Sequence, residues 1–347
     1  MIGERVRLAR EASGLTQREL ADAVGAPLSA IADLEIGRVH VPSEELIEGI
    51  ASATSFPAGF FRRGALPHMP EGHYRKLKRG TARVSKQVRA QVRQMLELVQ
   101  NAEGVLPLPP VLITPTPNIQ TAADVESAAD KLRQELGLGE RAPITNLVRA
   151  AERAGVVVVR LPAPFEDHDG FSVWPDAGLG GRPVVALGLT VNGDRDRHTL
   201  AHELGHLVLH TSRRDLSIDV AEAEAHRFAG ALLLPRKAAV EAMRPPLTLG
   251  VLMSVKAHYG TSLSMASRRA LDLALIDRTH FVSLQKQLSR RGWRLSEPIV
   301  VAVEKPILIG RILESLAGHG PIAARADRLG LPLFAFSSLL TNSSIRA

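Results

Sequence analysis

The chain has 347 residues, of which 45% are hydrophobic and 23% are charged, which is ordinary for a folded protein of two or three domains. It contains no cysteine, so disulfide bonds and thiolate chemistry are excluded, and any metal must be held by histidine and carboxylate side chains. No apolar run approaches the roughly 20 residues that span a bilayer, and residues 1–5 lack the apolar start of a secretory signal. We therefore expect a cytoplasmic protein with no membrane partner.

Positive charge is concentrated in one short segment. Residues 1–61 contain five basic and nine acidic side chains, whereas residues 62–93 contain ten basic and one acidic. Such a block is typical of a nucleic-acid contact, although a solvated helix face has the same composition. Its candidate contact residues are Arg75, Lys76, Lys78 and Arg79.

The first 60 residues have the pattern of a bundle of short helices. Gly14 follows a first helix, and Thr16 and Glu19 have the spacing of a capping box at the start of a second. Gly25 ends that helix, and Pro27 favours the start of a third. A helix, a short glycine-containing turn and another helix form the helix-turn-helix pattern.

The segment Leu15–Ala21, followed by Ile31, Leu34-Glu35 and Gly37, resembles the XRE-type helix-turn-helix of many phage repressors. The resemblance covers residues 3–60 and implies that Gln17 approaches a phosphate while the third helix enters the major groove. Ser29 is a further candidate contact, but the outward positions of the third helix are poor readers of base edges: Leu28, Ser29, Ala32 and Asp33. The module therefore either binds DNA with help from residues 62–93 or serves as a protein-contact bundle.

The middle of the chain alternates helical and strand-like patterns. From Ser85 onward we expect an amphipathic helix, and the five prolines within residues 106–117 favour an extended linker. Further helices are expected near residues 122–136 and 143–154. Strands are expected at residues 156–159, 170–174 and 183–189.

The segment His202-Glu203-Leu204-Gly205-His206 has the HExxH pattern. A helix completes a turn in about 3.6 residues, so His202 and His206 project from one face and can bind one metal ion at about 2 Å. Glu203 lies beside that face, where it can accept a proton from water at the metal. The helix is otherwise apolar and mostly buried, and buried polar groups need a partner such as a metal.

A zinc peptidase requires a third protein ligand and an open coordination position. The next helix offers Glu222 and Glu224, which point about 200° apart, so only one of them can face the metal. Glu222 shares its face with Ala225 and Ala229, whose small side chains would let the two helices approach closely. We predict Glu222 as the third ligand, with Glu224 as the alternative.

Three further histidines lie close to the predicted metal ligands. His198 and His210 extend the His202/His206 stripe by one turn in each direction, and we expect them to be structural or supporting residues. His226 lies one turn after the third-ligand candidate and could hydrogen-bond one of the two ligand imidazoles and orient it. An exposed helix histidine is an equally good interpretation of His226.

The segments 197–207, 222–235 and 249–275 resemble the ImmA/IrrE family of metallopeptidases, in which an XRE module often precedes the peptidase. The resemblance implies that His202, His206 and Glu222 bind Zn²⁺ and that Glu203 is the general base of peptide hydrolysis. The family usually has Asn where this chain has His226. Tyr259 and His258 are candidate oxyanion donors, although core or surface packing suits them better. We expect the substrate to lie along the edge of the strand at 183–189.

The sequence therefore predicts an α+β protein in four parts. An all-α helix-turn-helix bundle at 1–65 is followed by a basic helical connector and proline-rich linker at 66–117. A zincin-like peptidase domain with a small sheet and helices spans 118–275, and a small, mostly helical module spans 276–347.

The leading functional hypothesis is a zinc metallo-endopeptidase that cleaves a transcriptional repressor or similar regulator. By resemblance, the cleavage would switch on genes of a mobile element or a stress response. The alternative is a transcriptional regulator that uses a non-hydrolytic peptidase-like domain to bind partners around a structural metal. Structural zinc normally has four protein ligands, whereas the sequence offers three. A third hypothesis is that nucleic acid binds residues 62–93 and activates the enzyme.

Overall fold

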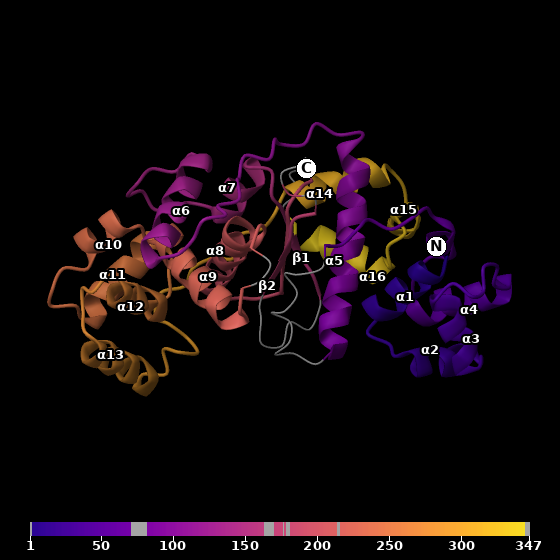
Figure 1. The fold of residues 1–347 in the computed structure, drawn as a ribbon, viewed down its shortest axis with the longest axis horizontal. Helices are drawn as coiled ribbons and strands as arrows, with labels where there is room; N and C mark the ends of the chain where they lie inside the picture. The colour runs from indigo at the N-terminus through magenta and orange to yellow at the C-terminus, as the bar shows by residue number, and fades with distance from the viewer. Residues whose placement is uncertain are drawn as a thin grey trace.

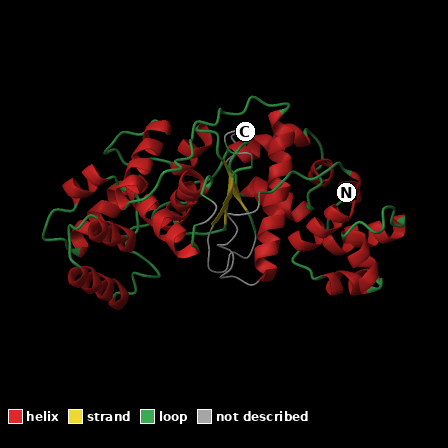
Figure 2. Ribbon diagram, in the orientation of Figure 1, coloured by secondary structure: helices red, strands yellow, loops and turns green. Residues whose placement is uncertain are grey.

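The computed structural model describes residues 2–70, 82–162, 170–175, 177, 181–213 and 216–343. Within these residues the chain forms sixteen α-helices, one short 3-10 helix and a three-stranded sheet, so the predicted α+β class is confirmed (Figures 1 and 2). The sheet lies near the middle of an elongated molecule, with a small helical bundle at either end (Figure 1). None of the helices in the described ranges is both long and apolar enough to cross a membrane.

The N-terminal bundle follows the sequence pattern closely. Thr16 accepts from the Glu19 amide and the Glu19 carboxylate accepts from the Thr16 amide, so the predicted capping box is confirmed. Gly25 has φ +66°, the left-handed conformation that ends a helix most readily at glycine. The bundle consists of α1 (Ile2–Ala12), α2 (Gln17–Val24), α3 (Leu28–Glu35), α4 (Glu44–Thr54) and η1 (Ala58–Arg62).

The sheet is small and buried on both faces. Its strands are β1 (Val157–Arg160), β2 (Gly170–Val173) and β3 (Val184–Leu187), in the order β1-β3-β2. β1 runs parallel to β3, and β2 runs antiparallel to it. β3 is therefore central and both its edges are paired, so the expectation that a substrate could pair with the strand at 183–189 is wrong. The outer strand on the side of the predicted metal helix is β2.

Two helical layers cover the sheet, and alternate side chains of each strand face one or the other. Val157 and Val159 face the layer of α5 (Ala82–Glu103) and three C-terminal helices, α14 (Leu308–Ala317), α15 (Ile322–Leu329) and α16 (Leu333–Thr341). Val158 faces the layer of α6 (Ala122–Glu135), α7 (Leu147–Arg153), α8 (Gly193–His210) and α9 (Ile218–Leu233). Burial on both faces explains why the strands are almost continuously apolar.

The C-terminal region does not form the separate module predicted for 276–347. Its first helix, α13 (Arg278–Arg290), packs with α10 (Arg236–Ala242), α11 (Leu249–Tyr259) and α12 (Leu263–Asp272) in a third core. The chain then crosses the molecule to bring α14–α16 against α5 and β1. The predicted connector likewise contributes a core helix, because α5 buries Val88, Val92 and Met95 beneath this C-terminal layer.

Buried polar contacts join the N-terminal bundle to the rest of the chain. Arg5 is 1% exposed and forms an ion pair of 2.5 Å with Glu97 of α5. Arg63, just after η1, donates to the carbonyl oxygens of Leu329 at 2.9 Å and Arg328 at 2.6 Å. The bundle is therefore held against both α5 and the end of α15.

Candidate metal centre

The predicted HExxH residues lie on α8 in the centre of the domain. Gly193–His210 form one continuous helix, and its apolar positions, among them Leu200, Leu204 and Leu207, are buried beneath the sheet and α9. The side chains of His202 and Glu203 are almost entirely buried as well, at 5% and 2% exposed. Two polar residues are thus carried into an apolar interior, where an uncompensated polar group would be costly.

α9 packs tightly along α8 and brings Glu222 to the histidines. A Cβ at Gly205 would come within 3.0 Å of the Phe228 ring, so glycine permits the close approach of the two helices. Ala225 and Ala229 are fully buried in the same contact. Ser217 caps the N-terminus of α9 by accepting from the Val220 amide, which fixes where the helix begins.

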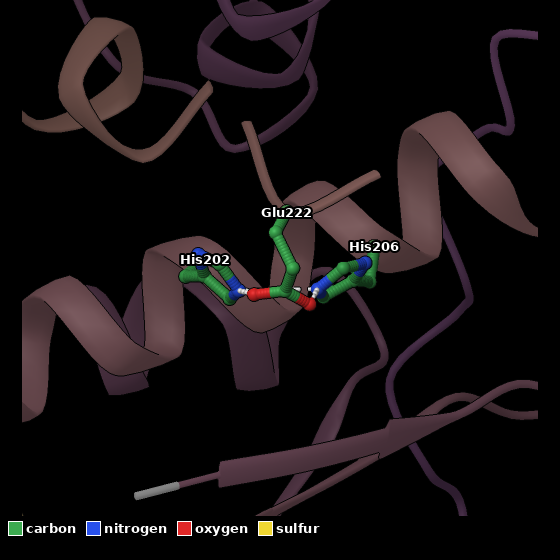
Figure 3. A group of neighbouring side chains, drawn as sticks. All are labelled: His202, His206 and Glu222. Atoms are coloured by element: carbon green, nitrogen blue, oxygen red, sulfur yellow. Dashed lines mark hydrogen bonds and ion pairs between the residues drawn. The ribbon is translucent and has the colours of Figure 1, made fainter. Parts of the chain in front are cut away.

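Three donor atoms meet between these helices. Glu222 directs one carboxylate oxygen at His202 Nε2 and the other at His206 Nε2, each at 3.4 Å (Figure 3). The two Nε2 atoms are 3.1 Å apart. Ligand atoms placed about 2.0–2.1 Å from a tetrahedral Zn²⁺ are about 3.3 Å from one another. Two imidazole nitrogens and a carboxylate are donors of the kind that zinc takes, and each nitrogen lies close to that distance from the other nitrogen and from one carboxylate oxygen.

Glu224, the alternative third ligand, has other partners. Its carboxylate accepts from Arg213 at 2.5 Å and is 3.0 Å from His210 Nε2. The two glutamates therefore point to different neighbours, as expected for residues two positions apart on a helix.

A chain of hydrogen bonds runs from His206 to Arg213. His206 Nδ1 lies 2.8 Å from His210 Nδ1, and His210 Nε2 lies 3.0 Å from Glu224 Oε2. The Glu224 carboxylate can accept a hydrogen bond from His210 Nε2–H. Neutral His210 then accepts at Nδ1 from His206 Nδ1–H. With its proton on Nδ1, His206 has its Nε2 lone pair facing Glu222. The residue that hydrogen-bonds a ligand imidazole and orients it is therefore His210, which is 3% exposed.

Glu203 is positioned by the neighbouring strand. Ser172 of β2 donates its hydroxyl to Glu203 Oε2 at 2.7 Å. A Cβ at Gly170 would lie 2.7 Å from Thr199 Cγ2 and 2.9 Å from Glu203 Cγ, so only glycine allows β2 to approach α8 this closely. Neither β2 residue is signalled by the sequence, because the strand and the helix are brought together only by the fold.

The remaining candidate residues have varied surroundings. His226 is exposed, and its ring centroid lies 4.4 Å from that of His202 and 5.5 Å from that of His198. Tyr259 packs in the α10–α13 core and donates its hydroxyl to the Arg141 carbonyl at 3.3 Å, and His258 packs edge-on against it. These contacts give neither Tyr259 nor His258 the geometry expected of an oxyanion donor.

The DNA-contact candidates are only partly described. The side-chain amide of Gln17 donates to Glu35, which also accepts from Arg10. The Gln17 amide therefore forms a hydrogen bond inside the bundle. Ser29 is exposed on α3. The four basic candidates lie outside the described residues: Arg75, Lys76, Lys78 and Arg79.

The fold and the site define a zincin-like helical domain joined to an N-terminal helix-turn-helix bundle. Residues 151–271 match the family model of the peptidase M78 group, described as the IrrE N-terminal-like domain, and residues 2–59 match that of a helix-turn-helix domain. The chain therefore carries both an IrrE N-terminal-like domain and a helix-turn-helix domain. The comparison with curated proteins finds no match.

Proposed function

We propose that this protein is a zinc-dependent endopeptidase that cleaves a transcriptional repressor or a similar regulatory protein. The observation that carries the proposal is the group formed by His202, His206 and Glu222, whose ligand atoms all lie within 4.8 Å of one another. Three protein ligands leave a coordination position for water or substrate, which is typical of catalytic rather than structural zinc. The helix-turn-helix bundle on the same chain supports a regulatory target and a role near DNA.

In the proposed mechanism the chain's own residues bind, orient and move a proton. Bound zinc would supply a Lewis acid that acidifies water and polarises the scissile carbonyl. Glu203 accepts the proton of the attacking water and passes it to the leaving amine. Ser172, by donating to Glu203 Oε2, holds the carboxylate in place.

β2 is the strand best placed to hold the substrate backbone. It is an outer strand of the described sheet, and its Gly170 and Ser172 contact Glu203. A substrate segment that paired with β2 would run past the base and the three metal ligands, and the main-chain hydrogen bonds would place its carbonyl.

Chelation tests the proposed activity. Purified protein incubated with the regulator encoded by a neighbouring gene should cut it at one or a few positions, because backbone pairing fixes the register. Cleavage should stop after treatment with a chelator and return with one equivalent of Zn²⁺, as followed by gel electrophoresis and mass spectrometry. Operator binding by the zinc-loaded protein without cleavage of any regulator would instead favour the non-hydrolytic alternative.

His210 should affect zinc affinity although it is not a predicted ligand. Replacing His210 with Ala removes the acceptor for His206 Nδ1, so the His206 ring loses its fixed tautomer and orientation, and we expect zinc to bind about 10–100-fold more weakly. Competition with a chromogenic chelator measures this change independently of activity. The exposed His258→Ala variant is the control. An unchanged zinc affinity in folded His210→Ala protein would show that the hydrogen-bond chain has no effect on the metal centre.

A further inference from the structure

A large pocket opens beside the metal centre. Its volume is about 990 Å³, and its walls come from the first turns of α8, the middle of α9, Lys256 of α11, α12, α13 and the segment 293–301. A pocket of this size accommodates a ligand as large as a short peptide segment. The sequence gives no sign of it, because the fold brings residues 191–198 and 223–230 against walls from residues 256–301.

The pocket lies next to the proposed active site, one helical turn away along α8 and α9. His198, one turn before His202 on α8, and His226, one turn after Glu222 on α9, both line it. Their rings stack across the two helices with centroids 5.5 Å apart. The pocket therefore begins one helical turn, or about 5.4 Å, from the metal-ligand candidates.

The charges at the mouth of the pocket are positive. Arg195, Arg268 and Arg294 line it and are exposed. The acidic lining residues are only 12–13% exposed, and all of them are paired with basic side chains. Asp194 and Glu297 both form ion pairs with the buried Lys256. Asp272 accepts from Arg268 and lies near Arg227. An approaching ligand thus meets exposed guanidinium groups first, of which Arg268 already shares its charge with Asp272, while the carboxylates beneath are paired with basic side chains.

Apolar side chains lie between the charges. Met265, Leu288 and Trp293 line the pocket, and so do Leu295 and Val300 of the segment 293–301, which are 88% and 87% exposed. Apolar side chains of a ligand could be buried here while its carboxylates remained at the arginine-rich mouth. A single-stranded nucleic acid is matched less well, since it requires a row of aromatic rings for its bases, and the described lining has one indole.

We propose that this pocket binds an acidic, amphipathic segment of the protein substrate next to the scissile bond. This inference rests on the proposed peptidase function and names the substrate chemistry that the site would select: Asp or Glu side chains at the arginines and apolar side chains in the interior. Exposed guanidinium groups suit this role because they bind carboxylates bidentately.

Binding can be measured without cleavage. The probes are a fluorescein-labelled decapeptide of Glu and Leu, its Lys and Leu counterpart, and a labelled ten-nucleotide oligo-dT, each titrated with full-length Glu203→Gln protein at low salt. Fluorescence anisotropy should show the acidic peptide binding at least about tenfold more tightly than the basic one. The R268E/R294E variant should weaken that binding by about tenfold or more, since two attractive contacts become repulsive.

A matched control separates the pocket from overall charge. Lys286 and Arg290 are exposed on α13 but do not line the pocket, so K286E/R290E changes net charge equally and should leave acidic-peptide binding within about twofold. Equal effects of the two double variants, or equal affinity for acidic and basic peptides, would overturn the inference. So would oligo-dT binding that is tighter than peptide binding and depends on Arg268 and Arg294.

The outcomes also distinguish this inference from the proposed function. Charge-selective binding in the pocket without cleavage of any regulator would leave the pocket assignment standing and remove the peptidase assignment. Zinc-dependent cleavage with no effect of R268E/R294E on peptide binding would leave the peptidase assignment standing and remove the pocket assignment.

Discussion

Replacing Glu203 with Gln should reduce cleavage by about 10²–10⁴-fold, the usual contribution of a general base, while zinc remains bound. The amide cannot accept the proton of the attacking water, but it has nearly the same shape as the carboxylate. Its oxygen can still accept from Ser172, which donates to Glu203 Oε2 at 2.7 Å. The metal ligands are not altered, so zinc content should stay near one equivalent per chain.

The measurement compares cleavage rate and zinc content of the same protein samples. Glu241→Gln is a matched control, because Glu241 is exposed on α10 and the same chemical change there should leave both quantities unchanged. A Glu203→Gln protein that retained zinc and cleaved at the wild-type rate would assign the proton transfer to another group. Loss of zinc together with activity would show that Glu203 supports the metal site rather than the chemistry.

The part of the site that the sequence predicts is the part set by helix periodicity. His202 and His206 are one turn apart whatever the fold, and Glu222 and Glu224 necessarily point in different directions. The composition of α9 also indicates close packing, since Ala225 and Ala229 share the Glu222 face. These local rules are sufficient to bring three candidate ligands together once two helices are in contact.

The features that the sequence does not predict depend on long-range contacts. Ser172 reaches Glu203 because β2 lies against α8, and the order β1-β3-β2 is not determined by strand propensity. The sequence indicates His210 as a supporting residue but not its partner Glu224, which reaches it only because α9 packs along α8. The same limit applies to α14–α16, whose apolar faces are readable in the sequence although their docking onto α5 is not.

The crossing segment between α13 and α14 should be essential for stability, and Glu304 is its main anchor. The Glu304 side chain is 8% exposed and forms an ion pair with Arg197 of α8, itself 5% exposed. Glu304 also accepts from the Val148 amide at 2.9 Å, and its carbonyl oxygen accepts from Arg160 at 2.7 Å. One residue thus connects the segment to α7, α8 and β1.

Replacing Glu304 with Ala should lower the free energy of unfolding by about 3–5 kcal/mol, because the guanidinium of Arg197 would remain buried without its counter-charge. Urea unfolding followed by the fluorescence of the two tryptophans reports this loss, since Trp174 lies in the core beside α8 and Trp293 lies at the start of the segment. Glu314→Ala removes an exposed glutamate of α14 and should change stability by less than about 0.5 kcal/mol.

The pH dependence of the Glu304→Ala effect has a definite sign. Burial raises the pKa of Glu304 above its ordinary value, with Arg197 opposing the shift. As pH falls through the interval between the raised and the ordinary pKa, the folded protein takes up this proton before the unfolded chain does, so wild-type stability gains relative to the variant. The difference in unfolding free energy between the two proteins should therefore widen on acidification. A difference that shrank would mean that the ion pair with Arg197, rather than burial, controls the Glu304 carboxyl.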